Sequence, residues 1–207
     1  HIINLEITLK KLDGVIKELS KIVSNGGNIL FVGTKSQAKD AIQLSADHCG
    51  MFYITERWLG GTLTNYSTIK KSIRRLKLLE KDSSPIYANL TKKERSMLDR
   101  EKLRLADLHR GIKDMRHLPS AIFVVDAKHE KIAISESKCL GIPTFGIVDT
   151  NTDPDVIDFP IPANDDSIKT IQLILNYIAT SLQELMGQSQ KSDDSSASTS
   201  AVEANVV

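Results

Sequence analysis

Hydrophobic residues along this chain occur in two patterns: short continuous runs, and longer stretches in which they recur every three or four positions. A continuous run bounded by turn residues is typical of a strand covered on both faces, and such runs occupy residues 28–32, 51–55, 121–126 and 144–149. The periodic pattern is typical of amphipathic helices and covers residues 3–23, 37–48, 130–140 and 166–185. Because the two kinds of element alternate, the sequence predicts an α/β fold with a parallel sheet and helices on both faces.

A fifth strand is predicted at residues 158–162, where Pro160 and Pro162 interrupt an otherwise apolar segment. Proline has no N–H group to donate to a neighbouring strand, so sheets accept it mainly at their edges. We therefore expect a five-stranded sheet in which this strand lies at an edge.

Two helices with mostly cationic surfaces are predicted within residues 57–117, between the second and third strands. A break at residues 82–85 ends the first helix, and the capping-box spacing of Thr91 and Glu94 indicates where the second begins. Their narrow apolar stripes consist of Tyr66, Ile69, Ile73 and Leu76 on the first helix and Met97, Leu98, Leu105, Leu108 and Ile112 on the second. Such stripes predict a coiled-coil hairpin whose helices cover each other, with little apolar surface left for the main core.

These elements divide the chain into three parts. Residues 1–56 and 118–186 are predicted to form the α/β sheet domain, and residues 57–117 a basic helical hairpin inserted into it. Residues 187–207 are Ser-rich with almost no large apolar side chains, so we expect a disordered tail. The first residue is His1 rather than Met, which suggests that the original start of the protein lies upstream.

The charges of the chain are unevenly distributed. Residues 57–117 carry 8 Lys and 8 Arg against 7 acidic residues, whereas the remainder carries 11 basic and 19 acidic residues. A solvated helical surface usually mixes the two signs, and that ordinary interpretation stays open for any single charge run. An excess of one sign confined to one segment favours a polyanionic partner, which Lys and Arg bind by displacing counterions from phosphates.

Other features of the composition exclude several classes of protein. No apolar run is long enough to span a membrane, and no secretory signal is present at the amino end. Cys49 and Cys139 lie in separate apolar segments, so we expect two buried, reduced thiols and no disulfide. The 5 His residues show no spacing typical of zinc ligands, and no metal site and no cofactor are predicted.

An enzymatic alternative rests on two acidic residues, Asp126 and Asp149, which end the third and fourth predicted strands. Open α/β sheets bind ligands at that edge, so these carboxylates would suit a Mg²⁺-dependent phosphoryl-transfer enzyme. Their simpler role is to cap the starts of the following segments. The turn at residues 33–36 between a strand and a helix lacks the spacing of a P-loop or a dinucleotide fingerprint, so it adds little to the enzymatic alternative.

Residues 57–65, which begin Arg57-Trp58-Leu59-Gly60-Gly61, resemble the signature loop of the bacterial-type small-subunit ribosomal protein S2 family. Residues 119–143 resemble its second signature, and residues 146–151 and 161–166 resemble its carboxyl-terminal region. The likeness extends in register from residue 1 to about residue 185. The chain departs from the family at Arg110, where the family usually has Gly, and in lacking the basic, aromatic-rich segment usually found upstream.

The resemblance implies a flavodoxin-like sheet domain with a protruding coiled-coil hairpin, bound to small-subunit ribosomal RNA. It also implies neighbouring ribosomal proteins, including the messenger-binding ribosomal protein S1 where a bacterium has it. No catalytic activity is expected, and the protein is expected in the ribosome of a bacterial cytoplasm or of an organelle.

We expect the hairpin to present its cations to RNA phosphates, recognising shape and backbone rather than base sequence. Trp58 has two interpretations, stacking on a base or packing at the hairpin root, and packing is favoured. Gly60 and Gly61 are predicted to serve the backbone geometry of the turn. The predicted RNA-binding residues are Arg57, Trp58, Lys70, Lys71, Arg74, Arg75, Lys92, Lys93, Arg95, Arg110, Lys113 and Arg116.

Overall fold

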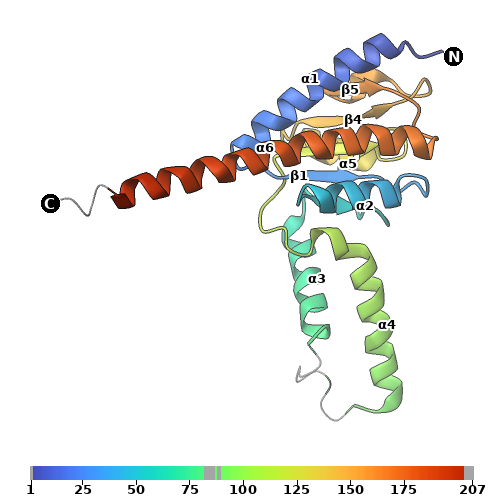
Figure 1. The fold of residues 1–207 in the computed structure, drawn as a ribbon. Coiled ribbons are helices and arrows are strands. Elements are labelled where there is room, and N and C mark those ends of the chain that lie inside the picture. The colour runs from blue at the N-terminus through green and yellow to red at the C-terminus, as the bar shows by residue number, and fades with distance from the viewer. Residues whose placement is uncertain (1, 82–86, 88–89, 203–207) are drawn as a thin grey trace.

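The sheet predicted from the apolar runs is present in a computed structural model, which describes residues 2–81, 87 and 90–202, with side chains described as far as residue 187. Its strands are β1 (Ile29–Val32), β2 (Phe52–Ile54), β3 (Ala121–Val125), β4 (Thr144–Val148) and β5 (Phe159–Pro162). The α-helices are α1 (Leu5–Ser24), α2 (Lys39–His48), α3 (Tyr66–Leu79), α4 (Lys92–His109), α5 (Lys131–Cys139) and α6 (Ile168–Val202). Figure 1 shows these elements as a sheet with its covering helices and a helical arm that projects away from it.

The strands are all parallel and lie in the order β2-β1-β3-β4-β5, which is the flavodoxin-like order. The prediction that the Pro-containing strand is at an edge is confirmed, because β5 pairs only with β4. Pro160 lies opposite Gly146 and Pro162 opposite Val148, and the other side of β5 needs no hydrogen-bond donors.

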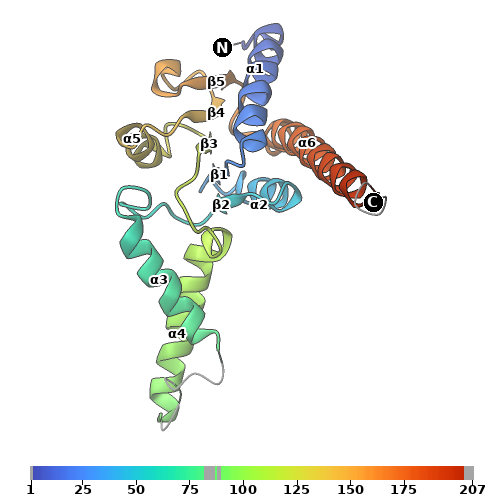
Figure 2. The ribbon, with the colours of Figure 1, turned by 90° about the vertical axis from the view of Figure 1, so that its left-hand side faces the viewer.

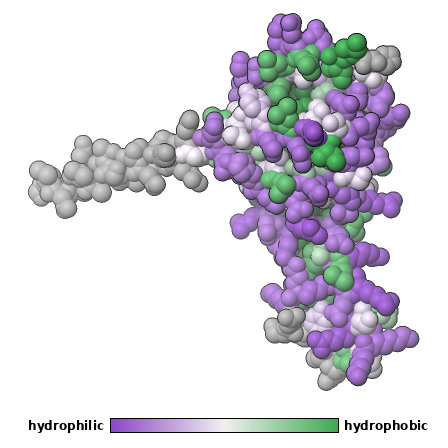
Figure 3. All heavy atoms as spheres, turned by 45° about the vertical axis from the view of Figure 1, so that its right-hand side comes forward, coloured by the Kyte–Doolittle hydropathy of each residue, from purple (hydrophilic) through white to green (hydrophobic). Residues whose placement is uncertain are grey.

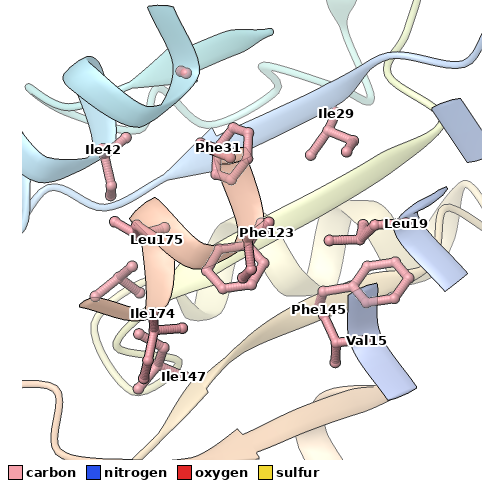
Figure 4. Close-up of a cluster of buried hydrophobic side chains, with 14 of the residues drawn as sticks. Val15, Leu19, Ile29, Phe31, Ile42, Phe123, Phe145, Ile147, Ile174 and Leu175 are labelled. Atoms are coloured by element: carbon pink, nitrogen blue, oxygen red, sulfur yellow. The ribbon is translucent and has the colours of Figure 1, made fainter. Parts of the chain in front are cut away.

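Successive residues of the central strands point to opposite faces and build two separate cores. Phe31 and Phe123 face the layer formed by α1, α2 and α6, where their ring centroids lie 5.6 Å apart (Figure 4). Their neighbours Leu30 and Ile122 face the opposite layer, which contains α5. Both cores consist of side chains that are almost completely removed from water, so each supplies hydrophobic stabilisation to the sheet.

Helices α3 and α4 project from the β2 edge of the sheet, as Figures 1 and 2 show from two directions. The expectation that their apolar stripes serve only each other is wrong. Tyr66, Ile69 and Ile73, at the base of α3, pack into the core beneath α5, because this part of the helix lies against the sheet. The seam between the helices is correspondingly short and consists of Leu76, Leu79 and Leu105 with Tyr87, Leu98 and Ala106 at its margins.

Several smaller expectations about the arm can also be compared with the structure. The capping box is confirmed: the Thr91 side chain accepts from the Glu94 backbone N–H, and the Glu94 carboxylate accepts from Thr91. Met97 does not join the seam, since it is 61% exposed on the outer surface of α4. The predicted break at residues 82–85 lies outside the described residues.

Helix α6 is described to Val202, and the disordered tail expected from residue 187 stays a prediction. One expectation about the cysteines needs correction. Cys49 is buried as expected, but Cys139 is exposed, because it is the last residue of α5 and lies away from the sheet. Within the described residues, no helix has the length and hydropathy that a bilayer span requires.

Candidate nucleic-acid interface

The root of the arm is built around Glu136 of α5, a residue that is 7% exposed. The loop between β2 and α3 wraps around this carboxylate. Trp58 donates its indole N–H to Oε1 at 3.0 Å, and the backbone N–H of Gly61 donates to the same oxygen at 2.8 Å. The backbone N–H groups of Leu63 and Thr64 donate to Oε2 at 2.9 and 3.1 Å, and the Thr64 hydroxyl adds a further bond at 3.1 Å.

These donors determine the charge state of Glu136. Burial alone would raise the pKa of the carboxyl group, but the hydrogen bonds from Trp58, Thr64, Leu63 and Gly61 outweigh it, and the pKa is lowered. The ionised carboxylate therefore holds the loop and fixes the start of α3. No feature of the sequence pattern identifies Glu136 as the partner, since it lies 75 residues from Gly61.

Gly61 has the backbone geometry predicted for it, and Gly60 does not. The φ angle of Gly61 is +87°, in the left-handed region, and a Cβ there would lie 3.1 Å from the Asn65 Cβ. Gly60 has no positive φ, and a Cβ at this position would meet nothing within 4 Å. The requirement for glycine in this turn thus rests on Gly61 alone.

The return from α4 to the sheet depends on Gly111. A Cβ at this position would lie 2.2 Å from the backbone oxygen of Tyr53, so only glycine allows the two segments to approach so closely. The neighbouring Arg110 has φ −47° and ψ −54°, which are ordinary helical values. The sequence departure at Arg110 therefore costs no backbone freedom, because the close approach occurs one residue later.

Trp58 is held in the protein rather than offered to a ligand. The residue is 7% exposed and belongs to the core that contains Leu63 and Ile112. Base stacking needs an accessible ring face, so this burial favours the packing role of Trp58 at the arm root, and its place among the RNA-binding residues stays a prediction.

Ion pairs within the arm divide the predicted cations into two groups. Arg75 binds Glu101 through two nitrogens, at 3.0 and 3.2 Å, and Arg110 lies 3.4 Å from Asp107. Lys113 pairs with Glu80. The charges of these cations are balanced by acidic residues of the arm. They are therefore weaker candidates for phosphate contact than the sequence pattern indicated.

The second group takes part in no ion pair among the described residues. Lys70 lies over the Tyr66 ring, with its ammonium nitrogen 4.9 Å from the ring centroid. Of the remaining members, Lys102 is half-buried, and Arg57 and Arg104 are exposed at the root of the arm. The others are exposed on the outer surfaces of the arm, where Figure 3 shows mainly hydrophilic residues. The remaining members are Arg57, Lys71, Arg74, Lys92, Lys93, Arg95 and Arg116 of the predicted set, together with Arg100, Lys102 and Arg104 of α4, which the prediction omitted.

A comparison with known protein families agrees with this architecture. The family model described as Ribosomal protein S2 matches residues 1–184. The chain belongs to the ribosomal protein S2 family. Members of this family are structural proteins of the small ribosomal subunit, so this S2-family chain is a ribosomal protein that assembles with ribosomal RNA and other ribosomal proteins.

The carboxyl edge of the sheet in this S2-family protein is organised by Lys35. Its ammonium nitrogen lies 3.2 Å from Asp126, 3.0 Å from Asp165 and 2.5 Å from Asp166. Burial lowers the pKa of Lys35, but the hydrogen bonds to these carboxylates outweigh it and raise the pKa overall. The single cation of the turn at residues 33–36 thus compensates acidic groups of the protein itself.

The two acids of the enzymatic alternative border the same acidic cluster but make different contacts. Asp126 has φ +66° and accepts a hydrogen bond from the His129 backbone N–H at 3.0 Å, so it supports the turn before α5 as well as binding Lys35. Asp149 lies instead with Asp165 and Asp166, and the carboxylate oxygens of these three residues are within 4.8 Å of one another. Such a group has the donor chemistry of a divalent-cation site, with Lys35 as the positive charge present.

Proposed function

We propose that this ribosomal protein binds small-subunit ribosomal RNA through the outer surfaces of α3 and α4, and that it supports subunit assembly and translation without catalysing a reaction. The main supporting observation is the set of arm cations that form no ion pair with any residue the structure describes. These groups retain their charge for an external partner, whereas the remainder of the chain has 11 basic and 19 acidic residues and would repel a polyanion.

The mechanism follows from the chemistry of folded RNA. The major groove of an A-form helix is deep and narrow, so side chains reach phosphates and 2′-hydroxyl groups more readily than base edges. Lys70 and Lys71 are adjacent in α3 and Arg74 lies about one turn further on. The three side chains would neutralise neighbouring phosphates and release counterions. The network around Glu136 keeps this surface at a fixed orientation to the sheet, which suits recognition by shape.

The division of the chain follows from the same proposal. Residues 1–56 and 118–186 serve as a scaffold, and residues 57–117 serve as the RNA-binding arm. Neighbouring ribosomal proteins contact the scaffold, and the messenger-binding ribosomal protein S1 is the proposed neighbour in bacteria that have it. The bacterial-type motifs support placing the chain in a ribosome of the bacterial cytoplasm or of an organelle.

The test is the affinity of the full chain for small-subunit ribosomal RNA, measured across a series of salt concentrations. We expect log K to fall steeply with log salt, and the triple variant Lys70→Gln, Lys71→Gln, Arg74→Gln to reduce that slope by about 1 per residue changed. The matched control removes three exposed lysines of the body, Lys10, Lys17 and Lys169. Equal losses in the arm variant and in this control would contradict the proposal.

A further inference from the structure

A hollow of about 770 Å³ opens at the root of the arm, away from the outer surfaces just described. It lies between the loop at residues 56–60, Ser72 of α3, Arg104 and Leu108 of α4, and Ile132 of α5. Its volume falls within the range of small-molecule binding sites. We call this feature the root hollow.

The charged groups around the root hollow are arranged to leave two cations available. Its two carboxylates are paired with cations outside its lining: Glu56 lies 2.7 Å from Lys39, and Asp107 lies 3.4 Å from Arg110. Arg57 and Arg104 also line the hollow, and neither forms an ion pair with any described residue.

The acid nearest to Arg104 is also compensated. Glu101, whose pKa is lowered by Arg75 and to a smaller extent by Arg104, is held by two nitrogens of Arg75. The available positive charge in the root hollow therefore belongs to the two guanidinium groups of Arg57 and Arg104, and an anion is the ligand that fits them.

The remaining walls are apolar, with a small polar area at the base. Leu59 and Leu108 are half-buried, and Ile132 is 58% exposed, so aliphatic surface faces the hollow. Ser72 and His109 also line it, with the Ser72 hydroxyl 2.8 Å from the His109 Nε2. Burial lowers the pKa of His109, so the ring adds no positive charge to the base of the hollow at physiological pH.

We propose that the root hollow binds one unstacked nucleotide from a single-stranded segment of RNA, with its phosphate at Arg57 and Arg104 and its base against the aliphatic walls. The two guanidinium groups suit the phosphate of a nucleotide, and the apolar surface beside them suits its base. An unpaired base is removed from water when it packs on side chains or on the plane of an arginine. This inference rests on the proposed RNA-binding function and adds a second contact that recognises single strands.

Trp58, the only tryptophan of the chain, lines the root hollow, so its fluorescence can report binding there. We would titrate the full chain with a short single-stranded RNA of mixed sequence and follow Trp58 fluorescence. Saturable quenching is expected, with binding about tenfold weaker in the double variant Arg57→Gln, Arg104→Gln. The control variant Lys17→Gln, Lys169→Gln removes two exposed charges from the body and should change the affinity less than about twofold.

Three outcomes would overturn the assignment. They are equal quenching by the single strand and by the same sequence in a duplex, equal quenching by an acidic peptide or inorganic phosphate, and an unchanged affinity in the double arginine variant. Failure of this inference is distinguishable from failure of the proposed function. Salt-dependent binding of ribosomal RNA without quenching would contradict only the proposal for the root hollow. Absence of salt-dependent binding would contradict the proposal that the arm binds RNA.

Discussion

The Trp58 indole and the Glu136 carboxylate are joined by a 3.0 Å hydrogen bond that connects the arm to the sheet domain across 78 residues of sequence. The bond is buried, and three backbone N–H groups of the same loop share the carboxylate. Because an unsatisfied buried group costs far more than a hydrogen bond gains, every member of this network depends on the others.

Replacement of Glu136 by Ala should therefore destabilise the protein by about 3 kcal/mol, since it leaves the indole and three backbone N–H groups without their acceptor. Chemical denaturation followed by Trp58 fluorescence measures the effect. Glu136→Gln keeps one acceptor oxygen and should lose less. The nearby exposed Lys138→Ala, also on α5, is the control for a general effect on this helix. Equal stability of Glu136→Ala and this control would contradict the role of the network.

The same carboxylate predicts a dependence of stability on pH. The folded-state pKa of Glu136 is lowered from 4.5, so the unfolded chain binds the proton more readily. The contribution of Glu136 is fully present above pH 4.5 and is lost as pH falls through the folded pKa. Unfolding free energies measured between neutral pH and pH 3 should therefore decline less steeply in Glu136→Gln than in the natural sequence; parallel curves would contradict this assignment.

Gly61→Val should displace the start of α3, because a branched side chain at φ +87° is strained and the Asn65 Cβ lies only 3.1 Å from the new Cβ. We expect a loss of about 2 kcal/mol in the free energy of unfolding and a defect in small-subunit assembly profiles. Gly60→Ala is the matched control, since its Cβ would meet nothing within 4 Å. An unchanged assembly profile in Gly61→Val would count against a role for this turn in orienting the arm.

Lys35→Met should leave Asp126, Asp165 and Asp166 close together without their shared cation. Burial, with Asp126 and Asp149 nearby, already raises the pKa of Asp165 despite Lys35, and removing Lys35 raises it further. The folded variant then binds protons more readily than the unfolded chain, so its stability deficit should shrink as pH falls from 7 toward 4. Denaturation curves at these two pH values test the sign, and a deficit that grows at low pH would contradict it.

The sequence was sufficient to predict a structural feature wherever that feature depends on residues close together in the chain. The capping box at Thr91 and Glu94 marks the start of α4, and the two prolines of β5 place that strand at the sheet edge. Both features act through a backbone N–H group that is either satisfied nearby or absent, so the sequence alone reveals them. The segregation of charge between the arm and the body is likewise a property of the sequence.

The tertiary structure decided which members of those patterns are used. It buried Trp58 against Glu136 and divided the apolar stripe of α3 between the sheet and α4. It also paired Arg75, Arg110 and Lys113, while other cations of the arm have no ion pair within the described part of the chain. It also placed Gly111 against Tyr53. These outcomes depend on contacts between segments far apart in the chain, whose distances no local pattern encodes. The sequence by itself therefore determined a basic arm on an α/β body, and only packing determined which of its side chains remain available to RNA.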